Sequence, residues 1–338
     1  MSEKVSARHV ADLAGVSRSA VSRVFTPGAS VSKATAEKVR KAAAELGYRP
    51  NVLARSLITG RSRIIGLVVA YLENYFYPEA LEKLSTALQG RGYHVLVFMT
   101  SDVSGDVDEV LSGILDYQVD GIIAASVALS SDLATRCRAA GVPVVLFNRS
   151  QDMAGVASVA SDNHGGGREI ARFLVAGGHR RIAYIAGWEG ASTQRDREAG
   201  FRDGLAEAGL ALCARGVGDY RHDRAAAAAR AMFDRPDRPD AVFVANDHMA
   251  FAVMDVLRFE LGLSVPGDVS VVGYDDVPPA AWPAYALTTV RQRANLMVER
   301  TVEVLLAQIE DGAAAGGPHI VPGPLIVRGS AQVPEGWT

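Results

Sequence analysis

Cysteines are scarce in this chain of 338 residues and long apolar runs are absent, which excludes two classes of protein. Cys137 and Cys213 stand far apart and outside CxxC spacing, so neither a disulfide framework nor a zinc cage is predicted. Apolar runs such as Ile64 to Tyr71 stay well below the roughly 18 residues that a membrane-spanning helix needs. The polar start of the chain also lacks the apolar core of a signal peptide. We therefore expect a cytoplasmic protein without a membrane partner.

Signatures of catalysis and of cofactor binding are missing as well. The sequence has no GxGxxG after a predicted strand, no Walker A motif, no HExxH and no GxSxG. The seven histidines are dispersed, so they form no metal-binding pattern. The run His164 to Gly167 contains three glycines without dinucleotide spacing, and these glycines more readily permit close lobe packing. We predict no enzymatic activity, no cofactor and no metal.

The net charge of −3 hides a strong asymmetry along the chain. Residues 1–63 carry twelve Lys and Arg against four Asp and Glu, which gives +8. The remaining 23 basic and 34 acidic residues give −11. A basic segment before a large acidic one indicates a nucleic-acid-binding head on a body that does not contact nucleic acid. The charge count alone leaves a solubilising basic tail open as the alternative.

The basic segment has the pattern of three short helices. Val10, Leu13 and Ala14 recur at helical spacing, and a Gly-Val-Ser turn follows whose serine can cap the next helix. A third helix is predicted from an N-cap at Ser32 to a stop at Gly47. Three such helices suffice for a small core.

The second of these helices separates a packing stripe from a free face. Ala20, Val21 and Val24 form the stripe. In a helix-turn-helix, the start of the second helix enters the major groove, where each base pair shows a distinct pattern of donors and acceptors. The polar side chains on the free face are therefore predicted to contact DNA: Arg18, Ser19, Ser22 and Arg23.

The stretch HVADLAGVSRSAVSRVF, followed by VSKATAEKVRKAAAELGYRPNVLARSL, resembles the headpiece of the lactose-repressor (LacI/GalR) family of bacterial transcription regulators. The resemblance implies a DNA-binding headpiece over residues 1–50, with a hinge helix and linker over residues 51–62. In that family, paired hinge helices enter the minor groove. By this resemblance Asn51, Ala54 and Leu57 contact DNA, and Leu57 wedges between base steps.

The hinge segment is too short to be a stable helix by itself. Residues 51–57 could form barely two turns, so we expect them to be disordered or frayed without DNA. Leu53 and Leu57 lie four residues apart and would form an apolar edge that a two-fold partner could cover. A plain interdomain linker ending at residues 59–60 is the alternative.

The acidic body alternates short apolar runs with helical stretches. Continuous apolar strands separated by helices predict parallel sheets covered on both faces. About 275 residues is long for one sheet, so we expect two doubly wound lobes. The predicted strands are 64–70, 94–99, 121–125, 142–147, 156–160, 181–186, 241–245 and 269–273, and the first predicted helices lie near 78–90 and 107–117.

Parallel sheets bind ligands beyond the carboxyl ends of their strands, so polar or aromatic residues directly after a strand are candidates for a binding site. Such residues occur in five places: Tyr75 to Tyr77, Asp162, Arg195 with Arg197, Asn246 with Asp247, and Asp275 with Asp276. Asp162, Asn246 and Asp275 are also natural helix caps or turn formers, which is the structural alternative at each position.

Residues 63–330 resemble the effector-binding domain of the same family, which is related to periplasmic sugar-binding proteins. The stretches VFVANDHMAFAVMDVL, GLSVPGDVSVVGYDD and LTTVRQ carry this resemblance. It implies hydrogen bonds from the protein to a sugar-like effector, with aromatic residues covering the ring. The residues to which it assigns the effector are Asp162, Arg197, Asn246, Asp275 and Gln292, with Tyr75, Phe76 and Trp282 as the aromatic candidates.

The resemblance also implies three crossings of the chain between the lobes of a periplasmic-binding-protein-like domain over residues 63–338. Lobe 1 is expected at about 63–161 and 293–320, and lobe 2 at about 162–290 and 321–330. The helix over residues 294–309 would return to lobe 1.

Head and body together predict a ligand-responsive, sequence-specific transcriptional regulator, namely a repressor controlled by a sugar or related metabolite. Two heads must meet two half-sites of a near-palindromic double-stranded DNA operator, which predicts a homodimer that is nucleoid-associated when bound. A sugar-binding protein without a DNA role is the alternative, and an enzyme on a Rossmann-like sheet is a weaker one.

Overall fold

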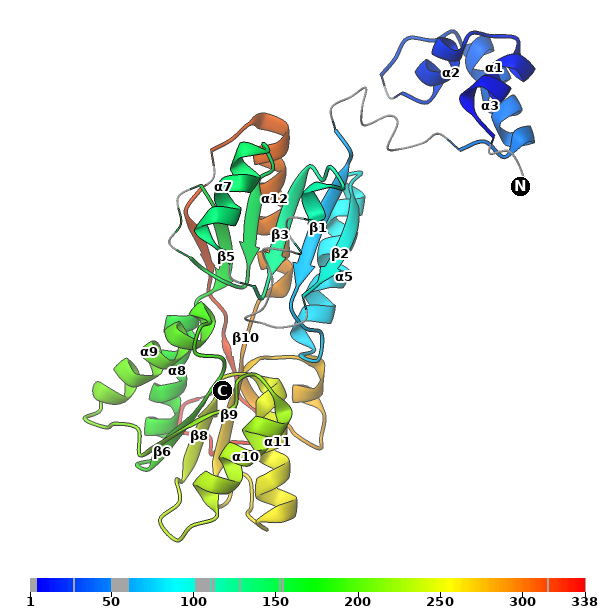
Figure 1. The fold of residues 1–338 in the computed structure, drawn as a ribbon. Coiled ribbons are helices and arrows are strands. Elements are labelled where there is room, and N and C mark those ends of the chain that lie inside the picture. Colours follow the sequence, from blue (N-terminus) through cyan, green and yellow to red (C-terminus); the bar gives the residue numbers. More distant parts are fainter. Residues whose placement is uncertain are drawn as a thin grey trace. The chain divides into compact units, whose positions relative to one another are not determined.

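The computed structural model describes residues 5–26, 28–49, 61–100, 110, 113–127, 129–151, 153, 155–314 and 316–337. The chain forms two compact units, Met1–Ser62 and Arg63–Thr338 (Figure 1). We call them the small unit and the large unit. The predicted hinge contacts Asn51, Ala54 and Leu57 lie outside the described residues.

Three helices make up the described part of the small unit. Their ends are set by local capping. Ser17 and Ser32 each accept a hydrogen bond from a backbone N–H three residues later, both at 3.2 Å. Gly15 and Gly47 end the first and third helices with φ of 60° and 63°, a left-handed conformation that glycine adopts without strain. The predicted turn, cap and stop residues are confirmed for the helices α1 (Ala7–Ala14), α2 (Arg18–Val24) and α3 (Lys33–Leu46).

The small unit has its own core, and Leu13, one of the three residues noted for their helical spacing, lies at the edge of that core. Leu13 is 49% exposed, whereas Val10 and Ala11 are buried. Each helical residue advances by about 100°, so a core face centred between Val10 and Ala11 includes Ala14 and leaves Leu13 at its edge. The buried residues of this core are Val10, Ala11, Val21, Val39, Ala42 and Ala43.

Two six-stranded sheets organise the described residues of the large unit. The first sheet is entirely parallel, with the order β11-β5-β4-β3-β1-β2. Its strands are β1 (Ile64–Val69), β2 (His94–Met99), β3 (Gly121–Ala125), β4 (Val144–Phe147), β5 (Ala157–Ser161) and β11 (Pro318–Val321). We call this sheet with its helices lobe 1.

The second sheet has the order β12-β10-β9-β8-β6-β7, and only β12 runs antiparallel to its neighbour. Its strands are β6 (Ile182–Ala186), β7 (Ala214–Val217), β8 (Ala241–Val244), β9 (Ser270–Asp275), β10 (Thr288–Arg291) and β12 (Leu325–Ile326). We call this sheet with its helices lobe 2. The short strands β7, β10, β11 and β12 were not among the predicted strands, and the other strands of the large unit lie within two residues of their predicted positions.

Helices cover both sheets. In lobe 1, α12 packs against α5, β4 and β5, and in lobe 2, α8 packs on α9 and α10 on α11 (Figure 1). The helices are α5 (Phe76–Gly90), α7 (Ser131–Ala139), α8 (Asn163–Ala176), α9 (Ser192–Ala206), α10 (His222–Phe233), α11 (Asp247–Asp255) and α12 (Ala294–Asp311), with a π-helical turn at Val256–Glu260 and a 3-10 turn at Pro278–Ala281. Of the predicted helix near 107–117, residues 110 and 113–115 are helical, and residues 107–109, 111 and 112 lie outside the described residues.

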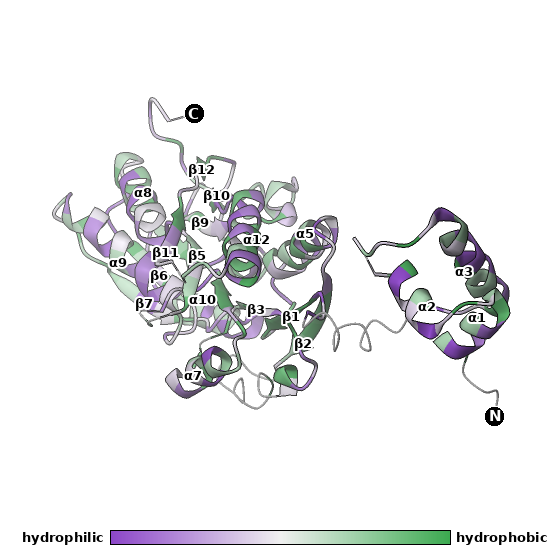
Figure 2. Ribbon diagram, turned by 90° about the horizontal axis from the view of Figure 1, so that it is seen from above, coloured by the Kyte–Doolittle hydropathy of each residue, from purple (hydrophilic) through white to green (hydrophobic). Residues whose placement is uncertain are grey.

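Alternate residues of the strands in lobe 1 belong to two different apolar clusters. In β1, Ile65 and Leu67 join one cluster and Val68 joins the other, and in β3 Ile122 and Ile123 are divided in the same way. Because neighbouring strand residues point to opposite faces, the sheet is buried on both sides. Figure 2 shows α12 with hydrophilic and hydrophobic residues intermixed, as a helix with one buried side requires. The predicted combination of a helix-turn-helix unit with a two-lobed α/β body is confirmed.

The chain crosses between the lobes at three places. It leaves the first sheet after β5, returns after β10 through α12, which packs in lobe 1, and leaves it again after β11 to place β12 beside β10. Among the described helices, none combines the length and the apolar character that crossing a bilayer requires.

Glycines allow α8 and α9 to approach each other closely. A Cβ atom on Gly200 would lie 1.9 Å from the carbonyl oxygen of His164, and one on Gly167 would lie 2.2 Å from that of Arg197. The glycine run after His164 therefore serves helix packing within lobe 2.

We predict that Gly200→Ala lowers the free energy of unfolding by about 2 kcal/mol or more, because the obstructing atom belongs to the backbone and cannot rotate away. Gly90→Ala is the matched control, since a Cβ there meets no atom within 4 Å and helical alanine is favoured over glycine. Urea unfolding followed by circular dichroism measures both. Equal stability of the two variants would contradict the close-packing explanation.

Candidate functional site

The carboxyl ends of strands from both sheets meet in the large unit. Arg149 follows β4, and its Nη1 donates a 2.6 Å hydrogen bond to the hydroxyl of Thr193 at the start of α9. Asn74 follows β1, and its Nδ2 donates to Oδ2 of Asp275, the last residue of β9, at 3.3 Å. These hydrogen bonds join lobe 1 to lobe 2 directly. We call the surrounding residues the inter-lobe site.

Asp275 is the most heavily bonded acidic residue of the inter-lobe site. Its Oδ1 accepts hydrogen bonds from Gln292 at 2.7 Å and from Arg197 at 3.3 Å. Burial raises the pKa of Asp275, while the charge of Arg197 and the hydrogen bonds from Gln292 and Asn74 oppose that rise. Its φ of 129° is rare for a residue with a side chain, so local backbone strain accompanies this position.

Arg197 is fully compensated within lobe 2. It is 2% exposed, and besides Asp275 it donates to Oδ1 of Asn163 at 2.8 Å and to the carbonyl oxygen of Ala245 at 2.5 Å. Its guanidinium also lies 3.7 Å from the centroid of the Tyr274 ring. Burial is the largest single influence and lowers the pKa of Arg197, but Asp275 and the hydroxyls of neighbouring tyrosines together outweigh it and leave that pKa raised. Arg197 and Asp275 therefore form a charged ion pair that further hydrogen bonds hold in place.

Asp247 lies beneath this pair and is fully buried. Its Oδ1 accepts a 2.6 Å hydrogen bond from the hydroxyl of Thr289, and its Oδ2 accepts one from the backbone N–H of Val277 at 3.0 Å. Burial, with the negative charge of Asp275 nearby, raises the pKa of Asp247 to about 7. Asp247 thus fastens the turn after β9 to β10, which sets the position of Asp275.

Several buried polar atoms at the inter-lobe site have no partner within the described part of the chain. Polar atoms in protein interiors are nearly always hydrogen-bonded, so each exception calls for a cause. The described residues contain six buried side-chain atoms without a partner. Four of the six lie on residues that follow β4, β8 or β10: Asn148 Oδ1, Arg149 Nε, Asn246 Nδ2 and Gln292 Oε1. They supply both donors and acceptors, which indicates that a polar molecule completes them.

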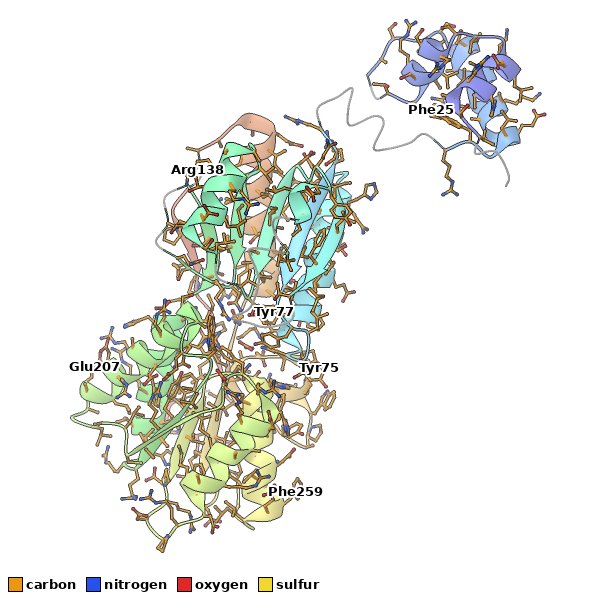
Figure 3. All side chains as sticks on the ribbon, viewed as in Figure 1. Phe25, Tyr75, Tyr77, Arg138, Glu207 and Phe259 are labelled. Atoms are coloured by element: carbon orange, nitrogen blue, oxygen red, sulfur yellow. The ribbon has the colours of Figure 1, made fainter. Side chains whose placement is uncertain are left out.

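Tyrosine hydroxyls complete the lining. Tyr77 lies where the lobes meet (Figure 3), and its hydroxyl accepts a hydrogen bond from Asn148 Nδ2 at 3.3 Å. The hydroxyl of Tyr220 lies 3.2 Å from that of Thr193, and Tyr71 packs edge-on against Tyr77. Burial raises the pKa of both Tyr71 and Tyr220, so these phenols remain neutral hydrogen-bond donors.

The structure brings four of the predicted effector residues together and places the others differently. Arg197, Asn246, Asp275 and Gln292 are buried at the strand ends. Asp162 accepts the backbone N–H of Gly165 at 2.9 Å and so caps α8, as its structural alternative proposed.

The predicted aromatic residues differ in burial. Phe76 is 2% exposed and stacks on Phe147 with a centroid distance of 6.2 Å, so it belongs to the core of lobe 1. Tyr75 and Trp282 are about half exposed. Their side chains are not packed into the cluster formed by Arg197 and Asp275.

Sequence reasoning missed Asn74, Ser126, Arg149, Thr193 and Tyr220. Ser126 directly follows a predicted strand and Arg149 lies two residues beyond one, so the rule that selected Asp275 could also have selected them. Tyr220 follows β7, which was not predicted, and Asn74 and Thr193 lie several residues beyond their strands.

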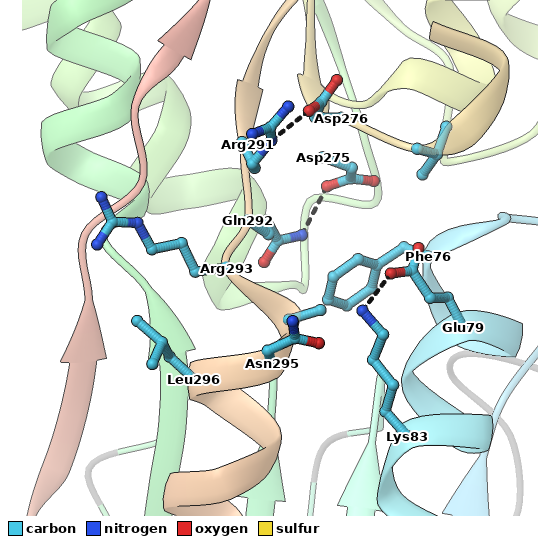
Figure 4. Close-up of a pocket in the computed structure, with 12 residues that line it drawn as sticks. Phe76, Glu79, Lys83, Asp275, Asp276, Arg291, Gln292, Arg293, Asn295 and Leu296 are labelled. Carbon is cyan, nitrogen blue, oxygen red and sulfur yellow. Dashed lines mark hydrogen bonds and ion pairs between the residues drawn. The ribbon is translucent and has the colours of Figure 1, made fainter. Parts of the chain in front are cut away.

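A pocket of about 370 Å³ opens beside the inter-lobe site, between α5 and the start of α12 (Figure 4). It shares Asp275 and Gln292 with that site. Of its other charged side chains, Glu79 pairs with Lys83 at 2.6 Å and Asp276 with Arg291 at 2.5 Å, and the exposed Arg293 has no ion pair within the described residues. Gln292 Oε1 is the pocket's one buried side-chain atom without a partner among the described residues, compared with four such atoms at the inter-lobe site.

In the small unit, all four polar residues predicted on the free face of α2 are exposed: Arg18, Ser19, Ser22 and Arg23. The hydroxyl of Ser19 lies 2.9 Å from that of Ser17. Arg23 Nε donates to the carbonyl oxygen of Ser19 at 3.4 Å, which holds its side chain along the helix. Arg18, at the start of α2, has no hydrogen bond or ion pair within the described residues and extends from the surface.

Two sequence models match this chain. Residues 8–51 match "Bacterial regulatory proteins, lacI family", and residues 171–331 match "Periplasmic binding protein-like domain". The transcriptional regulator CelR of Thermobifida fusca is 38% identical over 310 residues, which are 89% of this chain and 90% of that protein. The transcriptional repressor PurR of Vibrio vulnificus is 32% identical, covering 90% of this chain and 92% of that protein.

Solved structures show the same similarity over nearly the whole chain. A complex of the regulator CelR with cellobiose has a TM-score of 0.73 and 35% identity, and covers 97% of this chain and 100% of its own. The Lac repressor dimer bound to operator and the anti-inducer ONPF has a TM-score of 0.88 and 31% identity, and covers 98% and 100%.

We predict that Asp247→Asn changes how stability depends on pH. A carboxyl whose pKa is raised to about 7 stabilises the fold fully below its unfolded pKa of about 3.9, and loses that contribution as pH rises through 7. Since asparagine does not titrate, the unfolding free energy of the original protein minus that of the variant should fall by about 3 kcal/mol between pH 4 and 7.5.

Urea unfolding at a series of pH values measures this difference. Thr289→Val is the control, because it removes a donor to Asp247 and keeps the carboxyl, so the unfolding free energy of the original protein minus that of Thr289→Val should not show this fall. A constant difference between the original protein and Asp247→Asn over this range would contradict the role given to the carboxyl.

Proposed function

Because the chain belongs to the lacI family of bacterial regulatory proteins, we propose that its small unit binds operator DNA under the control of a molecule bound at the inter-lobe site. Membership confirms the predicted class of function, a DNA-binding transcriptional regulator and not an enzyme. The proposal adds the site, the kind of effector, the homodimer and action in the cytoplasm at the bacterial nucleoid.

One observation carries the effector site, namely the four unpartnered buried polar atoms at the strand ends. Two of these atoms are donors, on Arg149 and Asn246, and two are acceptors, on Asn148 and Gln292. A saccharide or related polyhydroxylated metabolite presents hydroxyl groups that both donate and accept, so it can complete all four. The solved complex of the regulator CelR with cellobiose supports an effector of this class.

The start of the large unit is fixed to lobe 1. The backbone N–H of Arg63 donates to Oδ2 of Asp120 at 3.0 Å, and its side chain pairs with Glu310 on α12 at 3.6 Å. The Arg63 guanidinium also lies 4.8 Å from the centroid of the Tyr93 ring. Arg63, the first residue of the large unit, therefore follows any movement of lobe 1.

An effector between the lobes would compete with or bridge their direct hydrogen bonds, Asn74 to Asp275 and Arg149 to Thr193. A change in lobe geometry then alters how two copies present their linkers and small units to DNA. A coupling free energy of about 1–3 kcal/mol is enough to change operator affinity between about 5-fold and 150-fold.

The DNA contacts of Asn51, Ala54 and Leu57 belong to this proposal. A homodimer follows from the two half-sites of a near-palindromic operator, and the solved Lac repressor dimer on its operator supports it.

We predict that Arg18→Ala weakens binding to the operator by about tenfold or more and leaves binding to random DNA nearly unchanged, because a base-reading arginine contributes about 1–3 kcal/mol of discrimination. The operator is the sequence that the purified protein selects from a random pool, and fluorescence anisotropy measures both affinities. Arg40→Ala removes the same charge from the exposed side of α3 and should reduce both affinities alike. Equal losses on both DNAs for Arg18→Ala would assign it to phosphate contact.

We predict that Asn246→Ser reduces effector affinity by about tenfold, because it removes the unpartnered amide donor. Serine can still cap α11, so folding and operator affinity without effector should be retained. The effector is found by screening saccharides and their derivatives for a rise in the thermal unfolding midpoint.

Asn295→Ser is the matched control, since Asn295 is exposed on α12 and lines the neighbouring pocket. An effector that changes operator affinity while binding normally to Asn246→Ser and weakly to Asn295→Ser would move the site to that pocket.

A further inference from the structure

The inter-lobe site contains two arginines that are equally buried and differently neutralised. Arg149 is 3% exposed and Arg197 is 2% exposed. Arg197 forms an ion pair with Asp275 at 3.3 Å. Within the described part of the chain, no carboxylate lies within 4.0 Å of the Arg149 guanidinium. Of these two buried arginines, Arg197 therefore has an anionic partner, and Arg149 has none among the described residues.

All the groups that bind Arg149 are neutral. Its Nη1 donates to the Thr193 hydroxyl at 2.6 Å and to the carbonyl oxygen of Asn148 at 3.3 Å, and its Nη2 donates to the Ser126 hydroxyl at 3.3 Å. Its guanidinium lies 6.0 Å from the ring centroid of Tyr220, whose phenol keeps its proton because burial raises its pKa. Hydrogen bonds of this kind orient the guanidinium without cancelling its charge.

Arginine cannot relieve this situation by losing its proton, because its pKa is too high. A guanidinium has five N–H groups, and three of those on Arg149 are used. The Nε–H is unpartnered, and only one hydrogen bond is found for Nη2, which has two N–H groups. The Nε–H and an Nη2–H of an arginine can together bind the two oxygens of a carboxylate or of a phosphate.

We propose that the effector carries an acidic group, a carboxylate or a phosphate, that binds Nε and Nη2 of Arg149. This inference rests on the proposed function and narrows its effector class to sugar acids, sugar phosphates and similar acidic polyols. The acidic group supplies the negative charge that the described residues do not provide to Arg149, and the hydroxyl groups of the effector bind Asn148, Asn246 and Gln292. A neutral sugar could bond the Nε–H but would leave the charge uncompensated.

The first test compares neutral sugars with their acidic forms on the full-length protein at constant ionic strength. The pairs are glucose with glucuronate and glucose 6-phosphate, galactose with galacturonate, and cellobiose with cellobionate. Calorimetric titration should show at least one acidic compound that binds about tenfold or more tightly than its neutral parent. The carboxylate and phosphate members distinguish the two kinds of acid.

Arg149→Met keeps the length of the side chain and removes its charge. It should abolish the preference for the acidic compound, so that the acid and its neutral parent bind the variant with affinities within about threefold of each other. Arg136→Met, on the exposed side of α7, is the control for loss of one positive charge and should keep the preference. A preference that survives in Arg149→Met would overturn the proposal.

Inorganic phosphate gives a test that needs no identified effector. At matched ionic strength, phosphate should raise the thermal unfolding midpoint above its value in chloride, and this rise should be absent from Arg149→Met. The proposal is wrong if neither phosphate nor any acidic compound stabilises the protein, or if a neutral parent binds as tightly as its acid. A neutral sugar that changes operator affinity would then leave the proposed function intact, whereas the proposed function itself fails if no compound of either kind does so.

Discussion

The geometry of the inter-lobe site depends on the buried ion pair between Arg197 and Asp275. Two charges removed from water are tolerated only when hydrogen bonds satisfy them from all sides. Asn163 and the carbonyl oxygen of Ala245 serve the arginine, and Gln292 serves the carboxylate. These partners come from α8, the end of β8 and the end of β10, so the requirement to satisfy one ion pair draws three separate chain segments to one point.

The same pair also holds the lobes against each other, because Asn74 of lobe 1 donates to Asp275 of lobe 2. With Arg149 and Thr193, it forms a small set of polar contacts between two well-packed sheets. Such polar contacts can be replaced by contacts with a ligand at little net cost in free energy. The packing contacts within the apolar core of each lobe cannot be replaced in this way. The difference localises conformational change to the boundary between the lobes and keeps each lobe rigid.

Local features of the fold were predictable because they depend on neighbouring residues. Caps such as Ser17 and Ser32, and the apolar strands β1, β3 and β9, are visible in short stretches of sequence. The strand β7 was missed because it contains Arg215, which an edge strand tolerates. The strand β10 was missed because it contains two threonines, whose hydroxyls are satisfied by buried hydrogen bonds. Leu13 shares the helical spacing of Val10 and Ala14 and is still half exposed, because periodicity identifies a helical face only to within about one residue.

Residues of the site were predictable only as far as strand ends could be recognised. That rule found Asn246 and Asp275, but it could not show that Asp162 caps α8 or that Phe76 packs into lobe 1, since caps and core aromatics occupy the same positions. It could not distinguish Arg149 from Arg197 either. The distinction is that Arg197 reaches the carboxylate of Asp275, whereas no carboxylate of the described residues lies within 4.0 Å of Arg149. Since arginine keeps its charge wherever it is buried, the lack of a counter-ion among those residues is itself chemical information about what the site accepts.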